Sequence, residues 1–230
     1  MTKQISNKGT VLALLVISIS FVQTVMAECD DKRKPGVDWS GCNKMHKLLD
    51  DQDFTGSRFD GANLSTSNLE ESIFTRASLV KTDLTRSSLN KARFSQSDLS
   101  KSVGYRASFE KTRFVNSKLT KSEYSRASFK QASFENIDWA KAELGRADFT
   151  DASLKEVNFE FSNMARATFK GAKLHGVYFT GAYTYQTHFE DTDLTGVSQL
   201  TQAQLDNACG DDDTKLPEGL VKPAKWPCEE

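Results

Sequence analysis

The sequence predicts a solenoid, a rod-shaped fold built by stacking a short internal repeat. From Phe54 to Leu194 a large residue recurs at every fifth position. We call these residues the centres, and 27 of the 29 are large and apolar or aromatic, all except Gly104 and Thr184. The residue two positions before a centre is Ala, Ser or Thr in 25 of 29 cases, and 13 of the 15 Phe residues are centres. Neither a helix nor a simple strand has a period of five, so the pattern indicates a repeat architecture.

Composition excludes several classes of protein. The chain has 230 residues, enough for one large domain or two small ones. Charged residues make up 27% and hydrophobic residues 38%, which excludes a multi-span membrane protein and a generally disordered chain. Lys and Arg number 30 against 31 Asp and Glu, and this balance gives no support to a generally basic nucleic-acid binder.

The segment 1–27 is typical of a secretory signal, with a basic start, an apolar stretch over 11–22 and small residues at 25 and 27. The apolar stretch is too short to cross the ~30 Å core of a membrane. Glu28 stands where a lipoprotein signal would need Cys. We therefore expect a mature chain of 28–230 with no membrane span, located in the periplasm or secreted.

Four cysteines flank the repetitive region, two on each side, and an oxidising compartment favours disulfides between them. Three pairings are possible. Local pairing is favoured because a rigid middle segment would hold the two ends apart, and each closed loop would contribute roughly 3 kcal/mol in the chain-entropy model. A zinc site made of all four is the alternative, although no C-x-x-C motif is present. The expected bridges are Cys29–Cys42 and Cys209–Cys228.

The repeat resembles that of the pentapeptide-repeat family, whose motif is A(D/N)LXX. The segments that match it closely are 61–65 (GANLS), 146–150 (RADFT) and 191–195 (DTDLT). The resemblance implies an all-β solenoid, a right-handed quadrilateral β-helix with one pentapeptide per side and four pentapeptides per coil. The 29 repeats, which we place in 51–196, would make about seven coils and a rod roughly 35 Å long.

A period of four pentapeptides brings similar centres together. Phe occupies one column of centres from Phe109 to Phe189 and a neighbouring column from Phe54 to Phe134. Rings stacked in this way fill the interior, so a small-molecule site inside the rod is not expected. Gly104 leaves a gap in its column, into which Tyr124 or Tyr105 is expected to lean.

Both ends of a solenoid need covering, because each exposes unpaired amides and apolar side chains. Residues 28–50 carry Trp39 and Leu49 in phase with the centres and are expected to start or plug the first coil. Residues 197–230 are expected to form a cap. There, Thr201-Gln202-Ala203-Gln204 is a capping-box pattern that predicts a short helix to about Ala208, with Gly210 just past its end and a disulfide-stapled extended tail beyond it. This tail also resembles those of exported bacterial pentapeptide-repeat proteins.

No catalytic motif or cofactor-binding motif appears, so we expect no enzyme and no cofactor. The three histidines, His46, His175 and His188, are interpreted as surface residues rather than as a metal site. Tyr178, Tyr183 and Tyr185 lie off the repeat near the C-terminal end. We interpret them as packed under the cap helix, the alternative being a patch that binds a partner or a second copy.

Basic residues recur two positions after a centre. They form two columns, and within each column one basic residue follows the last after four pentapeptides. Asp83, Glu123 and Glu143 follow the second column by two residues and could neutralise it. The columns are interpreted either as a polyanion-binding edge or as a solubilising edge, which is the commoner role of a charge run. The first column consists of Arg86, Arg106, Arg126, Arg146 and Arg166, and the second of Lys81, Lys101, Lys121 and Lys141.

These observations predict an exported, non-enzymatic scaffold or interaction protein of the bacterial envelope, which binds a protein or an anionic polymer through its outer faces. A homodimer formed through one end is compatible with the same pattern. The alternative, implied by the resemblance, is a cytoplasmic protein that mimics DNA and binds a topoisomerase, as some members of the family do. That function would need an acidic rod and a cytosolic location.

Overall fold

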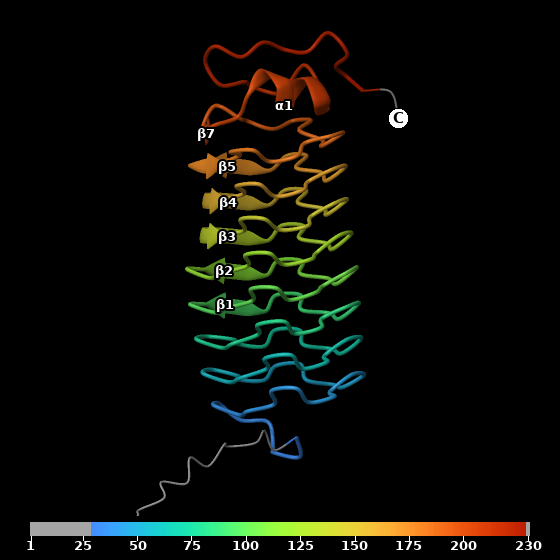
Figure 1. The fold of residues 1–230 in the computed structure, drawn as a ribbon, viewed down its shortest axis with the longest axis vertical. Coiled ribbons are helices and arrows are strands. Elements are labelled where there is room, and N and C mark those ends of the chain that lie inside the picture. The colour runs from blue at the N-terminus through green and yellow to red at the C-terminus, as the bar shows by residue number, and fades with distance from the viewer. Residues whose placement is uncertain (1–28, 229–230) are drawn as a thin grey trace, which may run out of the picture.

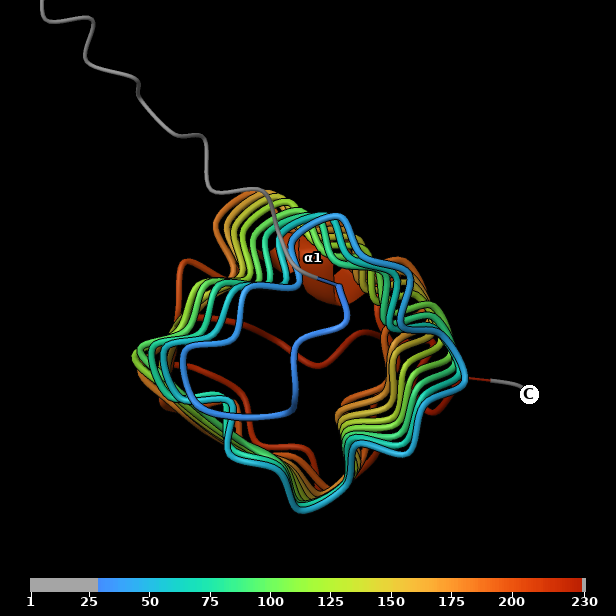
Figure 2. The same ribbon diagram turned by 90° about the horizontal axis from the view of Figure 1, so that it is seen from below.

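The computed structural model describes residues 29–228 as a rod of stacked coils with a short helix at its C-terminal end (Figure 1). The expected signal sequence, 1–27, lies outside the described residues. Along the axis the coils superpose as a four-sided outline (Figure 2). Parallel bridges join residues four pentapeptides apart, from Asp38 with Arg58 to Thr168 with His188. Each coil therefore contains four pentapeptides, as predicted. Within 29–228 no helix is long and apolar enough to span a membrane.

The coils form a parallel β-solenoid in which strands recur at the same place in successive turns. Residues that occupy the same place in successive coils pair with each other, as Phe94 pairs with Phe114 and Phe114 with Phe134. About five turns carry these strands, and isolated bridges continue the same stacking of coils on both sides of them. The strands are β1 (Arg93–Ser95), β2 (Arg113–Val115), β3 (Ser133–Asp138), β4 (Ser153–Asn158), β5 (Lys173–His175), β6 (Val177–Tyr178) and β7 (Val197–Ser198).

A tight turn forms most corners of the coil. The N–H of the small residue donates to the carbonyl of the centre three positions earlier, as from Ala62 to Phe59 at 2.8 Å. This bond closes a β-turn whose third residue, two after the centre, has a left-handed backbone; φ is 66° at Gly61 and 56° at Lys121. The conformation recurs at this position along the rod.

The centres form one continuous buried core, and the predicted ring stacks are present. Phe74 and Phe94 have ring centroids 4.7 Å apart at an interplanar angle of 7°, and Phe149 and Phe169 are 4.8 Å apart at 3°. Small residues beside the centres let successive coils approach closely. Where that residue is Thr its buried hydroxyl is satisfied by backbone, as Thr82 shows by donating to the Phe59 carbonyl at 2.7 Å.

The two exceptions among the centres have separate explanations. A Cβ on Gly104 would lie 2.2 Å from the Tyr124 ring, so Tyr124 fills the gap as predicted. Tyr124 is fully buried and its hydroxyl forms a 2.6 Å hydrogen bond with Ser102, while burial raises the pKa of Tyr124. Tyr105 is exposed and does not fill the space. Thr184 is polar because its hydroxyl donates to the Gln204 carbonyl in the cap at 2.8 Å.

The N-terminal segment contributes to the first coil. Trp39 and Leu49 are buried, and Asp38 and Leu48 bridge to the coil above. Both predicted disulfides are confirmed, Cys29–Cys42 at this end and Cys209–Cys228 at the other. The zinc alternative is therefore wrong, because all four sulfurs are used in disulfides.

Helix α1 (Gln202–Asn207) covers the C-terminal end, and its capping box between Thr201 and Gln204 is confirmed. The Gln204 amide also donates to the carbonyls of Phe179 and Ala182, both at 2.8 Å, which fixes the helix on the last coil. The predicted end of the helix near Ala208 is confirmed, and Gly210 lies just past it. The helix ends at Asn207 with Ala208 as its C-cap, and a Cβ on Gly210 would lie 2.4 Å from the Trp226 ring.

We expect Gly104→Leu to lower the free energy of unfolding by about 1–3 kcal/mol, because the new side chain would overlap the Tyr124 ring. The double variant Gly104→Leu, Tyr124→Leu should recover much of the loss, since the column would then resemble Leu64 and Leu84 below it. Thermal unfolding of both variants checks this. A single variant that melts above the wild type would show that the ring does not occupy the gap.

Candidate functional site

Two neighbouring corners of the rod carry the predicted Arg and Lys columns. Each Arg N–H donates to the carbonyl of the residue that precedes the next Arg, as from Arg86 to Tyr105 at 3.0 Å and from Arg126 to Gly145 at 2.9 Å. Successive members therefore lie one coil apart, about 4.8 Å. All nine side chains are exposed. We call the two columns and the side between them the basic face.

Every basic residue of these columns lies at the left-handed position of its turn, with φ between 56° and 61°. A residue with a Cβ pays roughly 1–2 kcal/mol for this conformation, a cost that Gly avoids. The Lys column has Gly61 before it and Gly181 after it, so the fold itself accepts Gly at this position. The basic residues are thus present although the turn would be less strained without them.

The charges of the columns are not neutralised locally. Among residues 29–228 none of the nine forms an ion pair within 4.0 Å. Arg166 donates to Gln186 at 2.8 Å, and the Arg106 guanidinium lies 5.3 Å from the centroid of the Tyr105 ring. Several basic residues on other sides are paired, as Lys155 is with Glu135 at 3.1 Å.

The acidic residues expected to neutralise the Lys column form other contacts. Asp83 accepts the N–H of Thr85 at 2.8 Å, and Glu143 accepts the Asn163 amide at 2.8 Å. These two and Glu123 lie on the basic face, so it carries nine positive and three negative side chains.

The three tyrosines do not pack under the cap helix, and that interpretation is wrong. Tyr178, Tyr183 and Tyr185 are 47%, 55% and 41% exposed. Helix α1 is instead held by Gln204 and the buried Leu205, which leave the tyrosine rings outside. The Tyr183 and Tyr185 rings are nearly parallel, with an interplanar angle of 12° and centroids 6.2 Å apart.

Phe161 is a further exposed aromatic residue and was not identified from the sequence. It occupies the turn position of the Lys column with φ 54°, and its side chain is 56% exposed. A Cβ on Gly181, one coil on, would lie 2.5 Å from the Phe161 ring, so the ring lies against that turn. We call Phe161, Tyr183 and Tyr185 the aromatic corner, whereas Tyr178 lies on the neighbouring side of the coil, in strand β6 beside Asn158. Most Phe residues are centres, so the position of Phe161 outside the centres is the signal that could have identified it.

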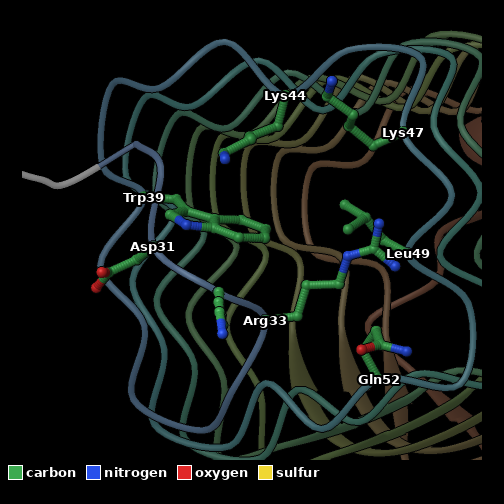
Figure 3. A pocket seen from close by; sticks show the side chains of 8 residues that line it. Asp31, Arg33, Trp39, Lys44, Lys47, Leu49 and Gln52 are labelled. Atoms are coloured by element: carbon green, nitrogen blue, oxygen red, sulfur yellow. The ribbon is translucent and has the colours of Figure 1, made fainter.

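A cavity of about 490 Å³ lies at the N-terminal end of the rod, beside Trp39 and Leu49 (Figure 3). Its rim is basic and includes Arg33, Lys44 and Lys47. The Lys44 ammonium lies 4.1 Å from the centroid of the Trp39 ring, and burial lowers the pKa of Lys44. The cavity belongs to the end of the rod and not to its stacked interior.

The histidines lie apart from one another. His46 contacts the Thr66 hydroxyl at 2.6 Å, His188 contacts Glu190 at 2.8 Å, and His175 is exposed. Hydrogen bonding to His188 lowers the pKa of Glu190 against the opposing effect of its burial. In the part of the chain that the structure describes, no group of three or more His, Cys, Asp or Glu could hold a metal ion.

The repeat, the parallel coils and the left-handed turns define a β-solenoid protein with a charged outer face. Residues 53–90, 87–123, 125–160, 142–181 and 172–209 match the family described as pentapeptide repeats, in eight copies, and the chain belongs to this family. A comparison with curated proteins gives no match.

Solved structures share the fold. A trypsin-treated form of QnrB1, a plasmid-mediated fluoroquinolone resistance protein, is 19% identical with a TM-score of 0.59, covering 80% of this chain and 92% of that one. Full-length QnrB1 is 16% identical with a TM-score of 0.53, covering 71% and 86%. HetL from Nostoc sp. strain PCC 7120, a pentapeptide-repeat protein involved in heterocyst differentiation regulation, is 22% identical with a TM-score of 0.38, covering 84% and 92%. At these identities the likeness to QnrB1 concerns the fold alone.

We expect Arg126→Gly to raise the free energy of unfolding by up to about 1 kcal/mol, because Gly removes the strain of the left-handed turn. Arg126→Val should lower it, since a β-branched residue tolerates this conformation least. Thermal unfolding of the two variants at one salt concentration checks the ranking. If Arg126→Gly melted below the wild type, the Arg side chain itself would be stabilising the fold.

Proposed function

We propose that this protein is an exported, non-enzymatic scaffold of the bacterial envelope that binds an anionic polymer through its basic face. The single observation that carries the proposal is the alignment of nine exposed basic side chains in two straight columns with no ion-pair partner among the described residues. A linear polyanion lying along the rod would contact both columns over several coils.

The uniform charge of the two columns favours a binding role over a solubilising one. The turn positions of the other two corners have the same left-handed backbone but carry mixed residues, such as Glu71, Gln131 and Asp151. The Lys and Arg columns instead carry only basic residues over four and five successive coils. The near-neutral composition and the basic corners also weigh against the DNA-mimicking alternative, which needs an acidic rod.

Export is supported by the two disulfides, because such bonds persist in oxidising compartments such as the periplasm. Cleavage after Ala27 would leave Cys29 second in the mature chain, where it forms the disulfide with Cys42.

We expect the protein purified from the periplasm or the medium to begin at Glu28 and to contain two disulfides. Intact mass before and after reduction measures both properties. A reduced cytosolic form that retains Met1 would contradict export and would favour the topoisomerase-binding alternative.

We expect the mature protein to bind heparin at low salt and to lose affinity steeply as salt rises, because binding releases counterions from the polyanion. Substitution of all five Arg of the Arg column by Glu should abolish this binding without loss of fold, because these side chains are exposed. Affinity measured by calorimetry at several salt concentrations, with circular dichroism for the fold, tests both statements.

The matched control variant changes five exposed basic residues on other sides to Glu and therefore has the same net charge. These residues are Arg76, Arg93, Lys111, Lys170 and Lys173. The control should retain most of the binding. Equal loss in the two variants would mean that only net charge matters, and no binding by the wild type at low salt would leave the columns as a solubilising edge.

A further inference from the structure

We propose that the aromatic corner holds a sugar ring, so that the anionic polymer bound along the basic face is an acidic polysaccharide. This inference rests on the proposed function and adds the chemical class of the ligand. It is carried by the position, the exposure and the turn geometry of Phe161, Tyr183 and Tyr185.

The aromatic corner continues the two basic columns. Phe161 follows Lys141 in the Lys column, one coil further along the rod. Tyr183 forms a parallel bridge with Asn163, and Tyr185 accepts through its carbonyl the N–H of Arg166, the last member of the Arg column. A polymer that follows the columns toward the C-terminal end of the rod therefore reaches exposed rings directly after the last charges.

The Phe161 ring is held in place by features that are costly for the fold, and the Tyr183 and Tyr185 rings stack on each other. Phe161 has φ 54°, a conformation that is rare for a bulky side chain. Its ring lies against the turn at Gly181, where any side chain would collide with it. Tyr183 and Tyr185 project from one side of a coil, on either side of the buried Thr184, with their rings nearly parallel. Aromatic faces that are fixed and half exposed are suited to stacking on the apolar face of a flat ring.

Charge complementarity and spacing favour a polysaccharide over duplex DNA. The cations recur about every 4.8 Å along each column, whereas phosphates of one strand of a duplex recur about every 3.4 Å along its axis. A rigid duplex would lose register with the columns within a few coils. A chain that carries one carboxylate on each sugar has charges separated by one sugar unit, which is close to the rise of one coil.

Single-stranded nucleic acid also combines anionic groups with rings that stack on aromatic side chains. The two disulfides favour the polysaccharide, because they are expected in the oxidising envelope, where acidic polysaccharides occur. The experiment includes an oligonucleotide so that this class of ligand is an outcome of the test.

The test compares polygalacturonate with inorganic polyphosphate, which has the charges but no sugar rings, and with a thymidine oligonucleotide, all on the full mature chain. In the double variant Tyr183→Ala, Tyr185→Ala we expect about tenfold weaker binding of polygalacturonate, the scale of one lost stacking contact. Binding of polyphosphate should be unchanged. Leu48→Ala, which removes an exposed apolar side chain at the opposite end of the rod, is the matched control and should alter neither.

Phe161→Lys provides a second variant in which the two probes should respond in opposite directions. It extends the Lys column by one charge and removes a ring, so polyphosphate should bind more tightly and polygalacturonate more weakly. The substitution keeps the residue type that the same turn carries at Lys141, and an unchanged melting temperature would show that the fold is retained.

The outcomes separate the two proposals. Suppose that the Arg-column substitution abolishes polyphosphate binding but the aromatic variants bind polygalacturonate as tightly as the wild type. This result would overturn the sugar site and leave the proposed function standing. If the aromatic variants weakened binding of the oligonucleotide but not of polygalacturonate, the sugar site would be overturned in favour of a nucleic-acid site. Binding of none of the probes at low salt would overturn both proposals.

Discussion

The rest of the structure depends on the backbone ladder between coils. Each coil donates and accepts hydrogen bonds with the coils on both sides in a strict register of four pentapeptides, as in Arg58 with Val37 at 2.9 Å and Trp39 with Arg58 at 2.8 Å. Because the register is the same at every corner, a residue type that recurs once per coil becomes a straight column. The ladder thus converts a sequence period into both the stacked Phe core and the basic face.

The same ladder determines where side chains can vary. The centres and the small residues point inward and are fixed by packing, so the exposed turn and side positions remain for function. The turn position has the additional constraint of a left-handed backbone. Residues other than Gly occupy that position at every corner, so the informative feature of the basic columns is the repetition of one charge over four and five successive coils, where other corners mix residues such as Glu71 and Gln131.

Much of the fold could be predicted from the sequence because the ladder has a fixed period. The centres, the ring columns, the Tyr124 side chain beside Gly104, both disulfides and the capping box at Thr201 all follow from local pattern or from stacking at the period of one coil. The exposure of Tyr183 and Tyr185 also follows from the period, since neither residue is at an inward position. It was missed because a cap was expected to cover them, and the area a cap covers depends on tertiary contacts such as that of Gln204 with Phe179.

Features that depend on packing outside the repeat could not be predicted. Gly210 lies just past the helix end as predicted, but a Cβ there would also meet the Trp226 ring, which comes from a tail with no periodicity. The cavity beside Trp39 is lined in part by residues such as Arg33 and Lys44 of the N-terminal segment, which lies before the repeat. The left-handed turns are a property of the corner geometry, and the sequence shows them only indirectly through the Gly residues scattered among Lys and Arg at that position.

The columns place an electrostatic cost on the folded protein that a ligand could relieve. Two unit charges one coil apart repel by about 0.9 kcal/mol in water before salt screening, and the Arg column contains four such neighbouring pairs. Extended side chains that diverge from one another reduce this repulsion but do not remove it, since the backbone ladder fixes their origins. An anionic polymer would neutralise the column in the folded state, where its charges are aligned, more effectively than in the unfolded chain. Binding and stability are therefore linked, and the repulsion along the basic face is the term that such a ligand would offset.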